Sequence, residues 1–212
     1  MKKVDKPANK VFFTADLHFG HDWLVKFNNR PYSSSKEMDE ALIKNWNQTV
    51  PSDGLVFVLG DIGYTSDERI IEVFKQLNGE KILIRGNHDT DNYQEETLLS
   101  LFSEIHELLF VRVQDYNHSI YHYMVLCHYP MLDWQNSYRG TWQLFGHIHT
   151  RKIKEFDTVK ARLFSSQYDV GVDNNHFKPI SCRDLNLIIE AQQKDENFKQ
   201  SNYYLNGDIP SE

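Results

Sequence analysis

The sequence predicts an α/β fold built as one sizeable domain. In its first half, three continuous apolar runs alternate with segments whose apolar residues recur at helical spacing. Apolar residues make up 40% of the 212 positions, which is enough to bury a real core. Continuous apolar runs are typical of parallel strands covered on both faces, so we expect a parallel sheet followed by a more antiparallel part.

The strands are predicted from short apolar runs that stop at glycine or polar residues. The later ones follow one another closely, which favours antiparallel pairing. Strands are expected at 11–15, 55–59, 81–84, 108–114, 120–127 and 142–145, with a hairpin over 151–172.

The helices are predicted from the 3.6-residue period and from capping residues. They are expected at 34–48, 66–78, 93–103 and 183–193. Ser34 with Glu37 fits a capping box for the first helix, and Ser181 with Asp184 fits a cap for the last. Gly79 follows the second helix, as glycine often does at a helix end.

Composition and charge limit the class of protein. We expect a single domain over 1–194 and a polar, loosely held tail over 195–212. No apolar run is long enough to cross a membrane and no signal peptide is evident, so a cytoplasmic protein without a membrane partner is expected. Cys127 and Cys182 show no CxxC spacing and are expected to be buried thiols. The net charge of −7 argues against a grip on long nucleic acid, and the oligomeric state stays open.

Five of the predicted strands end in residues of the type that binds metals. The endings are Asp16-x-His18, Gly60-Asp61, Gly86-Asn87-His88-Asp89, His128 and Gly146-His147-x-His149. Each ending alone has an ordinary reading, since a Gly-Asp pair is usually a turn and a lone histidine is usually structural. Sites in α/β sheets lie at the carboxyl ends of strands, so the five endings together predict one metal site.

This ordered set of motifs resembles the calcineurin-like metallophosphoesterase superfamily. The motifs run from residue 16 to residue 149, about two thirds of the chain. The stretches "DLHFGH" and "DVGVDNNHFKPIS" further resemble a small single-domain bacterial and phage subgroup. The resemblance implies a four-layer αββα sandwich, in which helices flank two mixed β-sheets.

The resemblance also implies two divalent metal ions. Asp16, His18, Asp61 and His149 would hold the first ion, and Asp61, Asn87, His128 and His147 would hold the second. Asp61 would therefore bridge the two ions. Mixed imidazole and oxygen ligands leave the metals open among Mn, Fe and Zn.

The same resemblance implies a mechanism, in which a hydroxide that bridges the metals attacks phosphorus in line. His88 would act as general acid toward the leaving oxygen. Asp89 would orient His88 and raise its pKa. Gly86 is expected to let the backbone turn sharply beside the site.

Several further residues are candidates for substrate contact. His21 would face the metals or the substrate, or else lie at a helix start. Arg30 is a candidate phosphate clamp, because its planar guanidinium suits phosphate oxygens. The alternative is a solvated loop residue. Tyr129, Tyr138 and Arg139 would stack on a nucleobase or pack at the edge of the core. Arg85 has no firm role and would pair with an acidic neighbour.

The expected function is metal-dependent hydrolysis of phosphate esters, as a phosphodiesterase on small nucleotides or related compounds. A nuclease or RNA-end-processing enzyme is the alternative, although such enzymes usually carry extra domains. A non-catalytic scaffold on the same fold is a third reading, but every ligand position and His88 are present. The expected partner is therefore a small phosphate-ester or nucleotide substrate.

Overall fold

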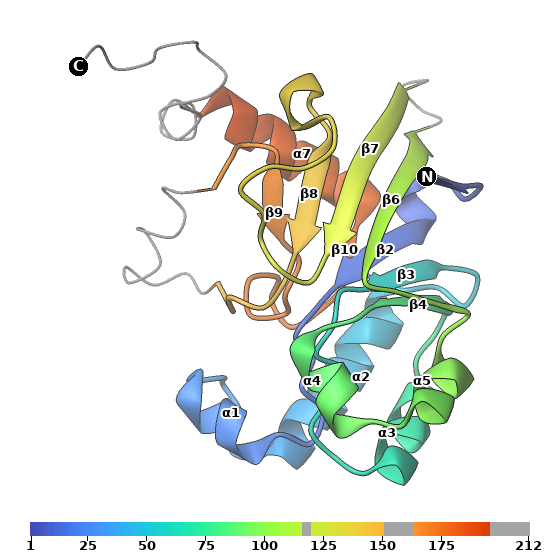
Figure 1. Ribbon diagram of the computed structural model, residues 1–212. Coiled ribbons are helices and arrows are strands. Elements are labelled where there is room, and N and C mark those ends of the chain that lie inside the picture. Colours follow the sequence, from blue (N-terminus) through green and yellow to red (C-terminus); the bar gives the residue numbers. More distant parts are fainter. Residues whose placement is uncertain (116–119, 151–162, 196–212) are drawn as a thin grey trace.

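The computed structural model describes residues 1–115, 120–150 and 163–195, and it contains two five-stranded sheets that lie face to face (Figure 1). In order across the first sheet, the strands are β10 (Ile180–Ser181), β2 (Val11–Thr14), β3 (Leu55–Val58), β4 (Glu80–Ile84) and β5 (Glu104–His106). In the second sheet, the order is β1 (Lys2–Val4), β6 (Leu108–Asp115), β7 (Ile120–Cys127), β8 (Trp142–Phe145) and β9 (Gln167–Asp169). The predicted α/β fold, with two mixed sheets flanked by helices, is confirmed.

The helices lie mainly against the first sheet. They are α1 (Asp22–Phe27), α2 (Ser35–Thr49), α3 (Asp67–Phe74), α4 (Asn87–Asn92), α5 (Glu95–Leu101) and α7 (Cys182–Lys194), with 3-10 turns η1 (Ala8–Lys10) and η2 (Ser137–Arg139). Among the described residues, no helix has the length and apolar character needed to span a bilayer.

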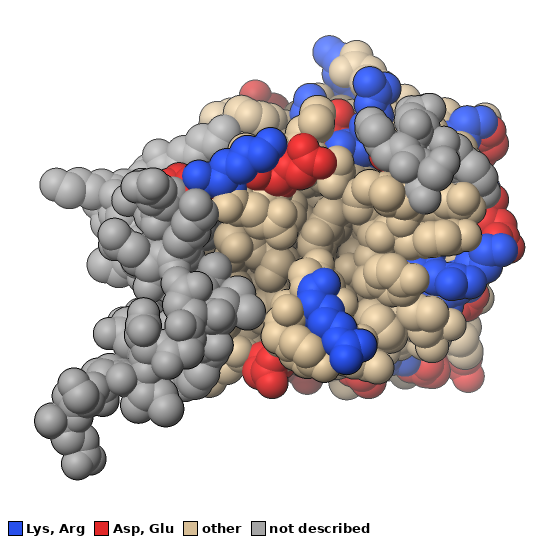
Figure 2. Space-filling model, turned by 90° about the horizontal axis from the view of Figure 1, so that it is seen from above, with Lys and Arg blue, Asp and Glu red and all other residues tan. Residues whose placement is uncertain are grey.

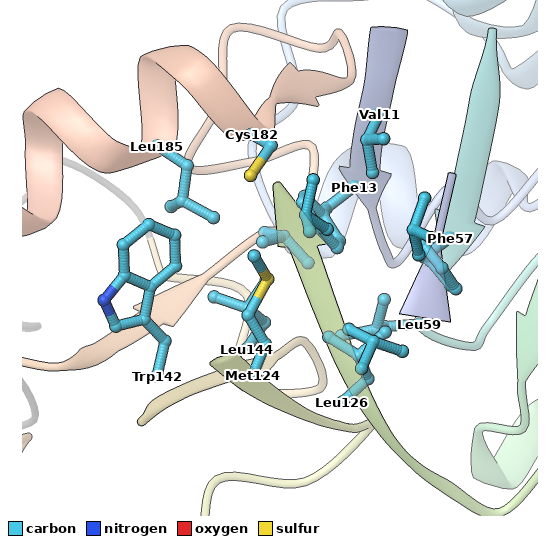
Figure 3. Packing of buried hydrophobic residues seen from close by; sticks show 14 of the residues in the cluster. Val11, Phe13, Phe57, Leu59, Met124, Leu126, Trp142, Leu144, Cys182 and Leu185 are labelled. Atoms are coloured by element: carbon cyan, nitrogen blue, oxygen red, sulfur yellow. The ribbon is translucent and has the colours of Figure 1, made fainter. Parts of the chain in front are cut away.

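One apolar core fills the space between the two sheets. Phe13 of β2 and Phe57 of β3 stack with ring centroids 5.5 Å apart, and both are fully buried. From the facing sheet, Met124 and Leu144 pack into the same cluster (Figure 3). Leu185 of α7 joins it as well, so the C-terminal helix helps to close this core.

A second core lies between the first sheet and its helices. Val56 and Val58 of β3 point to the opposite side from Phe57, as the strand period requires. They pack with Leu42 and Trp46 of α2. Burial on both faces explains why β3 is a continuous apolar run in the sequence.

The strand pairings correct part of the topology expected from the sequence. Strands β2, β3 and β4 are parallel, and β6 and β7 are antiparallel, as predicted. An additional strand, β5, pairs in parallel with β4. However, β7–β8 and β8–β9 pair in parallel, so the expectation of antiparallel pairing was wrong there. The segment 128–141 carries the chain back before β8 begins, which allows a parallel return without a long helix.

The helix limits and caps are close to the predicted ones. The Oγ atoms of Ser34 and Ser181 accept hydrogen bonds from the backbone N–H groups of Glu37 and Asp184. The capping box at Ser34 is only half formed, because the Glu37 carboxylate accepts from Ser33 instead of from the N-cap backbone. The helix predicted over 66–78 ends at Phe74, followed by turns.

Several elements were missed or differ. Three short strands, β1, β5 and β10, were not predicted because two or three residues carry no periodic signal. The segment predicted as one helix over 93–103 begins only at Glu95, and a separate helix, α4, precedes it. Of the predicted hairpin 151–172, residues 151–162 lie outside the described part, and β9 pairs in parallel with β8. Residues 196–212 of the predicted tail also lie outside it.

Replacing Phe57 with Ala removes a fully buried ring from the centre of the core between the sheets. We expect the free energy of unfolding to fall by about 3–5 kcal/mol, from lost transfer energy and the cavity left behind. Urea denaturation measures the loss. The control is Leu99→Ala, at a side chain that is 60% exposed, where a change within about 0.5 kcal/mol is expected. Equal losses in the two variants would contradict this account of the core.

Candidate metal centre

The carboxyl ends of strands from both sheets meet at one place. Beyond β2 and β3 the chain continues side by side, since the backbone N–H groups of Asp16 and His18 donate to the carbonyls of Gly60 and Asp61. The second sheet joins this junction, because the N–H of His147 donates to the Asp16 carboxylate at 3.0 Å. The predicted convergence of strand endings therefore holds for these residues.

A first group of ligand atoms comes from Asp16, His18 and His149, and these atoms lie within 4.8 Å of one another. The Nε2 atom of His18 is buried and has no hydrogen-bond partner, and it lies 3.6 Å from Oδ2 of Asp61. Burial, and then the neighbouring His149, hold the pKa of His18 well below its usual range. A buried neutral imidazole with an unused nitrogen is what a divalent metal requires.

A second group comes from Asp16, Asp61 and His128, again within 4.8 Å. The Nδ1 atom of His128 lies 2.7 Å from the Leu59 carbonyl, which can only accept, so Nδ1 carries the proton. Its Nε2 atom therefore offers a lone pair, and it lies 3.2 Å from Oδ1 of Asn87 and 3.5 Å from Oδ2 of Asp61. A backbone carbonyl that sets the tautomer is a common feature of metal-binding histidines.

The charges of the site favour bound cations. Burial raises the pKa of Asp16 well above its usual range, and the nearby Asp169 and Asp61 carboxylates add to the rise, opposed by His149. Burial also raises the pKa of Asp169. For His149, burial lowers the pKa, but the Asp16 and Asp173 carboxylates outweigh it and raise the value. Clustered carboxylates that draw protons would equally draw divalent ions, so these residues fit a metal centre.

His147 lies at the edge of this cluster. Its ring is exposed and stands 5.1 Å from the His128 ring in an edge-on orientation. It is absent from both tight groups of ligand atoms in the described part of the chain. The structure thus brings it beside the site, and its ligand role stays a prediction.

The backbone at the site adopts a conformation that is rare outside glycine. A φ between 47° and 70° is found at five predicted ligands: Asp16, His18, Asp61, His147 and His149. Each such residue is held in the left-handed region, which is unfavourable for side chains with a Cβ. Strain of this kind persists only where the surrounding structure enforces it, and it clusters at functional sites.

Arg30 is neither a phosphate clamp nor a solvated loop residue, which corrects both of its readings. Arg30 is 4% exposed, and its guanidinium makes a two-pronged ion pair with Asp173, through Nε at 3.0 Å and Nη2 at 2.7 Å. It also donates to the backbone carbonyls of Asp16 and Leu17. With its donors used in this way, Arg30 supports the loop that carries the first ligands.

Asp173 links this support to the metal centre and was missed in the sequence. Its Oδ2 accepts from Nδ1 of His149 at 2.8 Å, which leaves Nε2 of His149 for a metal. Burial would raise the pKa of Asp173, but the His149 hydrogen bond and the Arg30 charge lower it to about 2. In the sequence, Asp173 stands out only by its position in the stretch "DVGVDNN", and this stretch does not indicate that it contacts Arg30 or His149.

Asp89 does not orient His88, so that prediction was wrong. Its buried carboxylate accepts from the backbone N–H groups of Asp61, Ile62 and Gly86, at 2.8 to 3.0 Å. It therefore connects the loop after β3 to the start of α4. Burial raises the pKa of Asp89 to about 7, although these N–H groups oppose the rise.

The sequence analysis expected a sharp turn at Gly86, and this was wrong. Gly86 is required because its backbone lies close to the Asp61 and His128 side chains. Its φ of −100° and ψ of 173° are extended backbone that any residue can adopt. A Cβ at this position would collide with Oδ1 of Asp61 and would lie 3.0 Å from Cε1 of His128. The strand ending after β4 can reach the ligands only because no side chain intervenes.

His88 and His21 both lie beside the first group of ligands. The His88 ring centroid is 5.4 Å from that of His18, and its backbone N–H donates to Asp61 at 3.0 Å. His21 has Nδ1 3.3 Å from Nδ1 of His18 and stacks on Tyr64 at 4.6 Å between centroids. Both histidines line one cleft together with His18 and His149. Of the two readings of His21 the structure shows both, because His21 is also the N-cap residue of α1.

The aromatic residues after His128 divide into two sets. Tyr129 is exposed and stands edge-on to His128 and His147, with centroids 5.0 and 4.8 Å away. Tyr138 lines a separate cavity with Trp134, and Arg139 stacks on its ring. No described contact connects Tyr138 or Arg139 with the ligand side chains, so the structure does not bring them to the site.

Arg85 pairs with acidic neighbours, as one reading of the sequence expected. Its guanidinium contacts Glu95 of α5 and lies 3.3 Å from Glu107. These contacts connect the end of β4 to neighbouring elements and leave Arg85 outside the cleft. Cys127 and Cys182 are buried free thiols, as predicted.

The chain is similar in sequence and in fold to several known proteins. A family model described as calcineurin-like phosphoesterase matches residues 9–151. An uncharacterised protein of Methanocaldococcus jannaschii is 33% identical over 187 residues, which cover 87% of this chain and 92% of that protein. The Gene 66 protein of Mycobacterium phage L5 is 27% identical, over 78% of this chain and 87% of its own. A solved structure of a protein of unknown function from Aquifex aeolicus shares the fold, with a TM-score of 0.63, 21% identity, and coverage of 84% of this chain and 98% of that chain.

Replacing Asp173 with Asn keeps the shape of the side chain but removes the charge that orients His149. We expect metal affinity to fall about 10- to 100-fold, the usual effect of losing such a partner. Equilibrium dialysis with Mn²⁺ measures the affinity per folded protein. Asp53→Asn is the matched control, because that carboxylate pairs with Lys10 at the surface. Unchanged affinity in Asp173→Asn would show that the contact with His149 does not support metal binding.

Proposed function

Because the chain belongs to the calcineurin-like phosphoesterase family, we propose that it is a hydrolase that uses two divalent metal ions to cleave phosphodiesters of small nucleotides or related compounds. The observation that carries the proposal is the position of Asp61. Its Oδ2 atom lies 3.6 Å from Nε2 of His18 and 3.5 Å from Nε2 of His128. One carboxylate between two imidazoles, each with an available nitrogen, suits a bridging ligand.

The predicted ligands divide between two ions around this carboxylate. Asp16, His18 and His149 would hold one ion, and Asn87, His128 and His147 would hold the other, with Asp61 shared. Two such ions supply charge neutralisation for the phosphate oxygens and a nucleophile at neutral pH. Mn, Fe and Zn all suit this set of nitrogen and oxygen ligands.

His88 would move the proton. It lies at the start of α4, where the hydrogen bond from its backbone N–H to Asp61 fixes its position relative to the shared ligand. Its ring lines the same cleft as His18 and His149. A ring nitrogen there can donate a proton to the leaving oxygen of an ester bound at the metals.

The net charge of the chain favours a small substrate. On the face that Figure 2 shows, which is turned away from the carboxyl ends of β7 and β8, the Lys and Arg side chains of the described residues stand apart. A protein that follows a long phosphate backbone usually carries a continuous strip of such side chains, and this chain has a net charge of −7. The net charge therefore fits recognition of a small ester in a local cleft better than recognition of long nucleic acid.

Replacing His88 with Ala should lower turnover about 10²- to 10⁴-fold while both metals remain bound, because the variant loses the general acid but no ligand. The loss should be greatest for a substrate with a poor leaving group, such as a dinucleotide, and smallest for bis-p-nitrophenyl phosphate. Steady-state kinetics with both substrates, together with metal analysis, measures this. Equal turnover of the dinucleotide in the wild type and the variant would exclude the proton-donor role.

Replacing Asp61 with Ala should remove metal and activity together, since this carboxylate is expected to contact both ions. Metal content and the rate with bis-p-nitrophenyl phosphate are measured on the same sample. Asp91→Ala is the matched control, because Asp91 is an exposed acidic residue of the neighbouring α4. A variant with two bound metals and full activity would contradict the bridging role.

A substrate panel with Mn²⁺ tests the proposed activity itself. It contains p-nitrophenyl phosphate, bis-p-nitrophenyl phosphate, 2′,3′ and 3′,5′ cyclic nucleotides, and labelled single-stranded DNA and RNA. We expect turnover of the diesters and cyclic nucleotides. Efficient cleavage of the long strands would favour a nuclease instead, and a protein inert on every ester would contradict the enzymatic proposal.

A further inference from the structure

A row of aromatic rings leads away from the metal centre along the surface. We call it the aromatic row, and it consists of Tyr64, His21, Trp23 and Phe27. The His21 and Tyr64 rings are stacked, with centroids 4.6 Å apart and planes 20° apart. Trp23 lies 6.1 Å from His21, and Phe27 stacks on Trp23 at 4.3 Å and 16°.

The aromatic row is continuous with the cleft at the metal ligands. Trp23 and Tyr64 line the same hollow, of about 590 Å³, as His18, His88 and His149. The Tyr64 ring also stands 6.4 Å from the His88 ring. A molecule whose phosphate lies at the metals therefore has an aromatic wall beside it.

The rings are held in place although they are exposed. Trp23 is 61% exposed, Phe27 63% and Tyr64 53%, so burial in the core does not account for them. Leu24 and Val25, on the opposite side of α1, are buried and anchor this short helix. Asp22 accepts from the backbone N–H of Ser35 at 2.8 Å, which ties α1 to the beginning of α2.

Figure 1 shows the resulting arrangement: α1 stands apart from the other helices at the lower left. Exposed rings arranged in two stacked pairs, Tyr64 with His21 and Trp23 with Phe27, cost solvation energy without stabilising a core. Such an arrangement is suited to a planar ligand group, because every nucleobase offers a π-face for stacking.

We propose that the aromatic row, with Trp23 at its centre, binds the base of a nucleoside phosphate whose phosphate group lies at the metal centre. This inference rests on the proposed function and specifies its substrate class. Stacking recognises the base by its face and not by its hydrogen-bonding edge, so the site takes all four bases with modest preference.

Binding measurements test the inference separately from the activity. Isothermal titration calorimetry on the Mn²⁺-loaded protein compares thymidine 5′-monophosphate with 1′,2′-dideoxyribose 5′-phosphate, which has the same phosphate but no base. We expect the wild type to bind the nucleotide about tenfold more tightly, a typical effect of stacking one base. Trp23→Ala should remove this difference, and Trp23→Phe should keep most of it.

The controls separate stacking from structural effects. Tyr123→Ala removes an aromatic ring that is 39% exposed on β7, and it should leave both affinities unchanged. Equal affinity of the wild type for the two ligands would overturn the inference. Equal weakening of both ligands by Trp23→Ala would also overturn it, because the ring would then only maintain the shape of the cleft.

The proposed activity is measured in parallel with bis-p-nitrophenyl phosphate. If the wild type hydrolyses this ester but binds thymidine 5′-monophosphate and the base-free sugar phosphate with equal affinity, the proposed base site is wrong and the proposed activity is supported. If the wild type hydrolyses no ester but prefers the nucleotide, and Trp23→Ala removes this preference, the proposed activity is wrong and the proposed base site is supported.

Discussion

Several aspartates are buried in one small volume where the two sheets meet, and the surrounding loops are arranged to compensate their charge. Asp16, Asp61 and Asp89 are each at most 2% exposed. A buried carboxylate is stable only if hydrogen bonds or cations compensate for lost water. For Asp89, backbone N–H groups donate these hydrogen bonds. The backbone N–H of His147 donates to Asp16 and that of His88 donates to Asp61, which compensates these two carboxylates in part. Divalent ions would supply the remaining compensation, and folding and metal binding would then be coupled.

The surrounding fold holds the predicted ligands close together although their backbone is strained. Ligand residues in the left-handed region of φ need support from outside their own loops. The ion pair between Arg30 and Asp173 provides it, because Arg30 binds the carbonyls beside Asp16 while Asp173 orients His149. A residue that looked like a substrate ligand is thus a structural support, and the cleft beside the predicted ligands is lined by histidines together with Trp23 and Tyr64.

Much of the fold and of the site was predictable, for local reasons. The strands β2, β3 and β4 and the caps at Ser34 and Ser181 follow from short patterns in adjacent residues. Two- and three-residue strands such as β1 and β10 carry no such pattern. The parallel return from β7 to β8 also escaped prediction, because strand direction depends on the path of the intervening segment and not on strand composition.

The residue types that follow the buried strands can be read from the sequence, and they predict a metal-binding site with a histidine beside it at the strand ends. The partner of each side chain is known only from the folded chain. Asp89 binds backbone N–H groups instead of His88, Arg30 pairs with Asp173 across 143 positions, and Tyr64 stacks on His21. The physical reason is that these contacts join segments far apart in the chain, where no local period or spacing encodes which groups will meet.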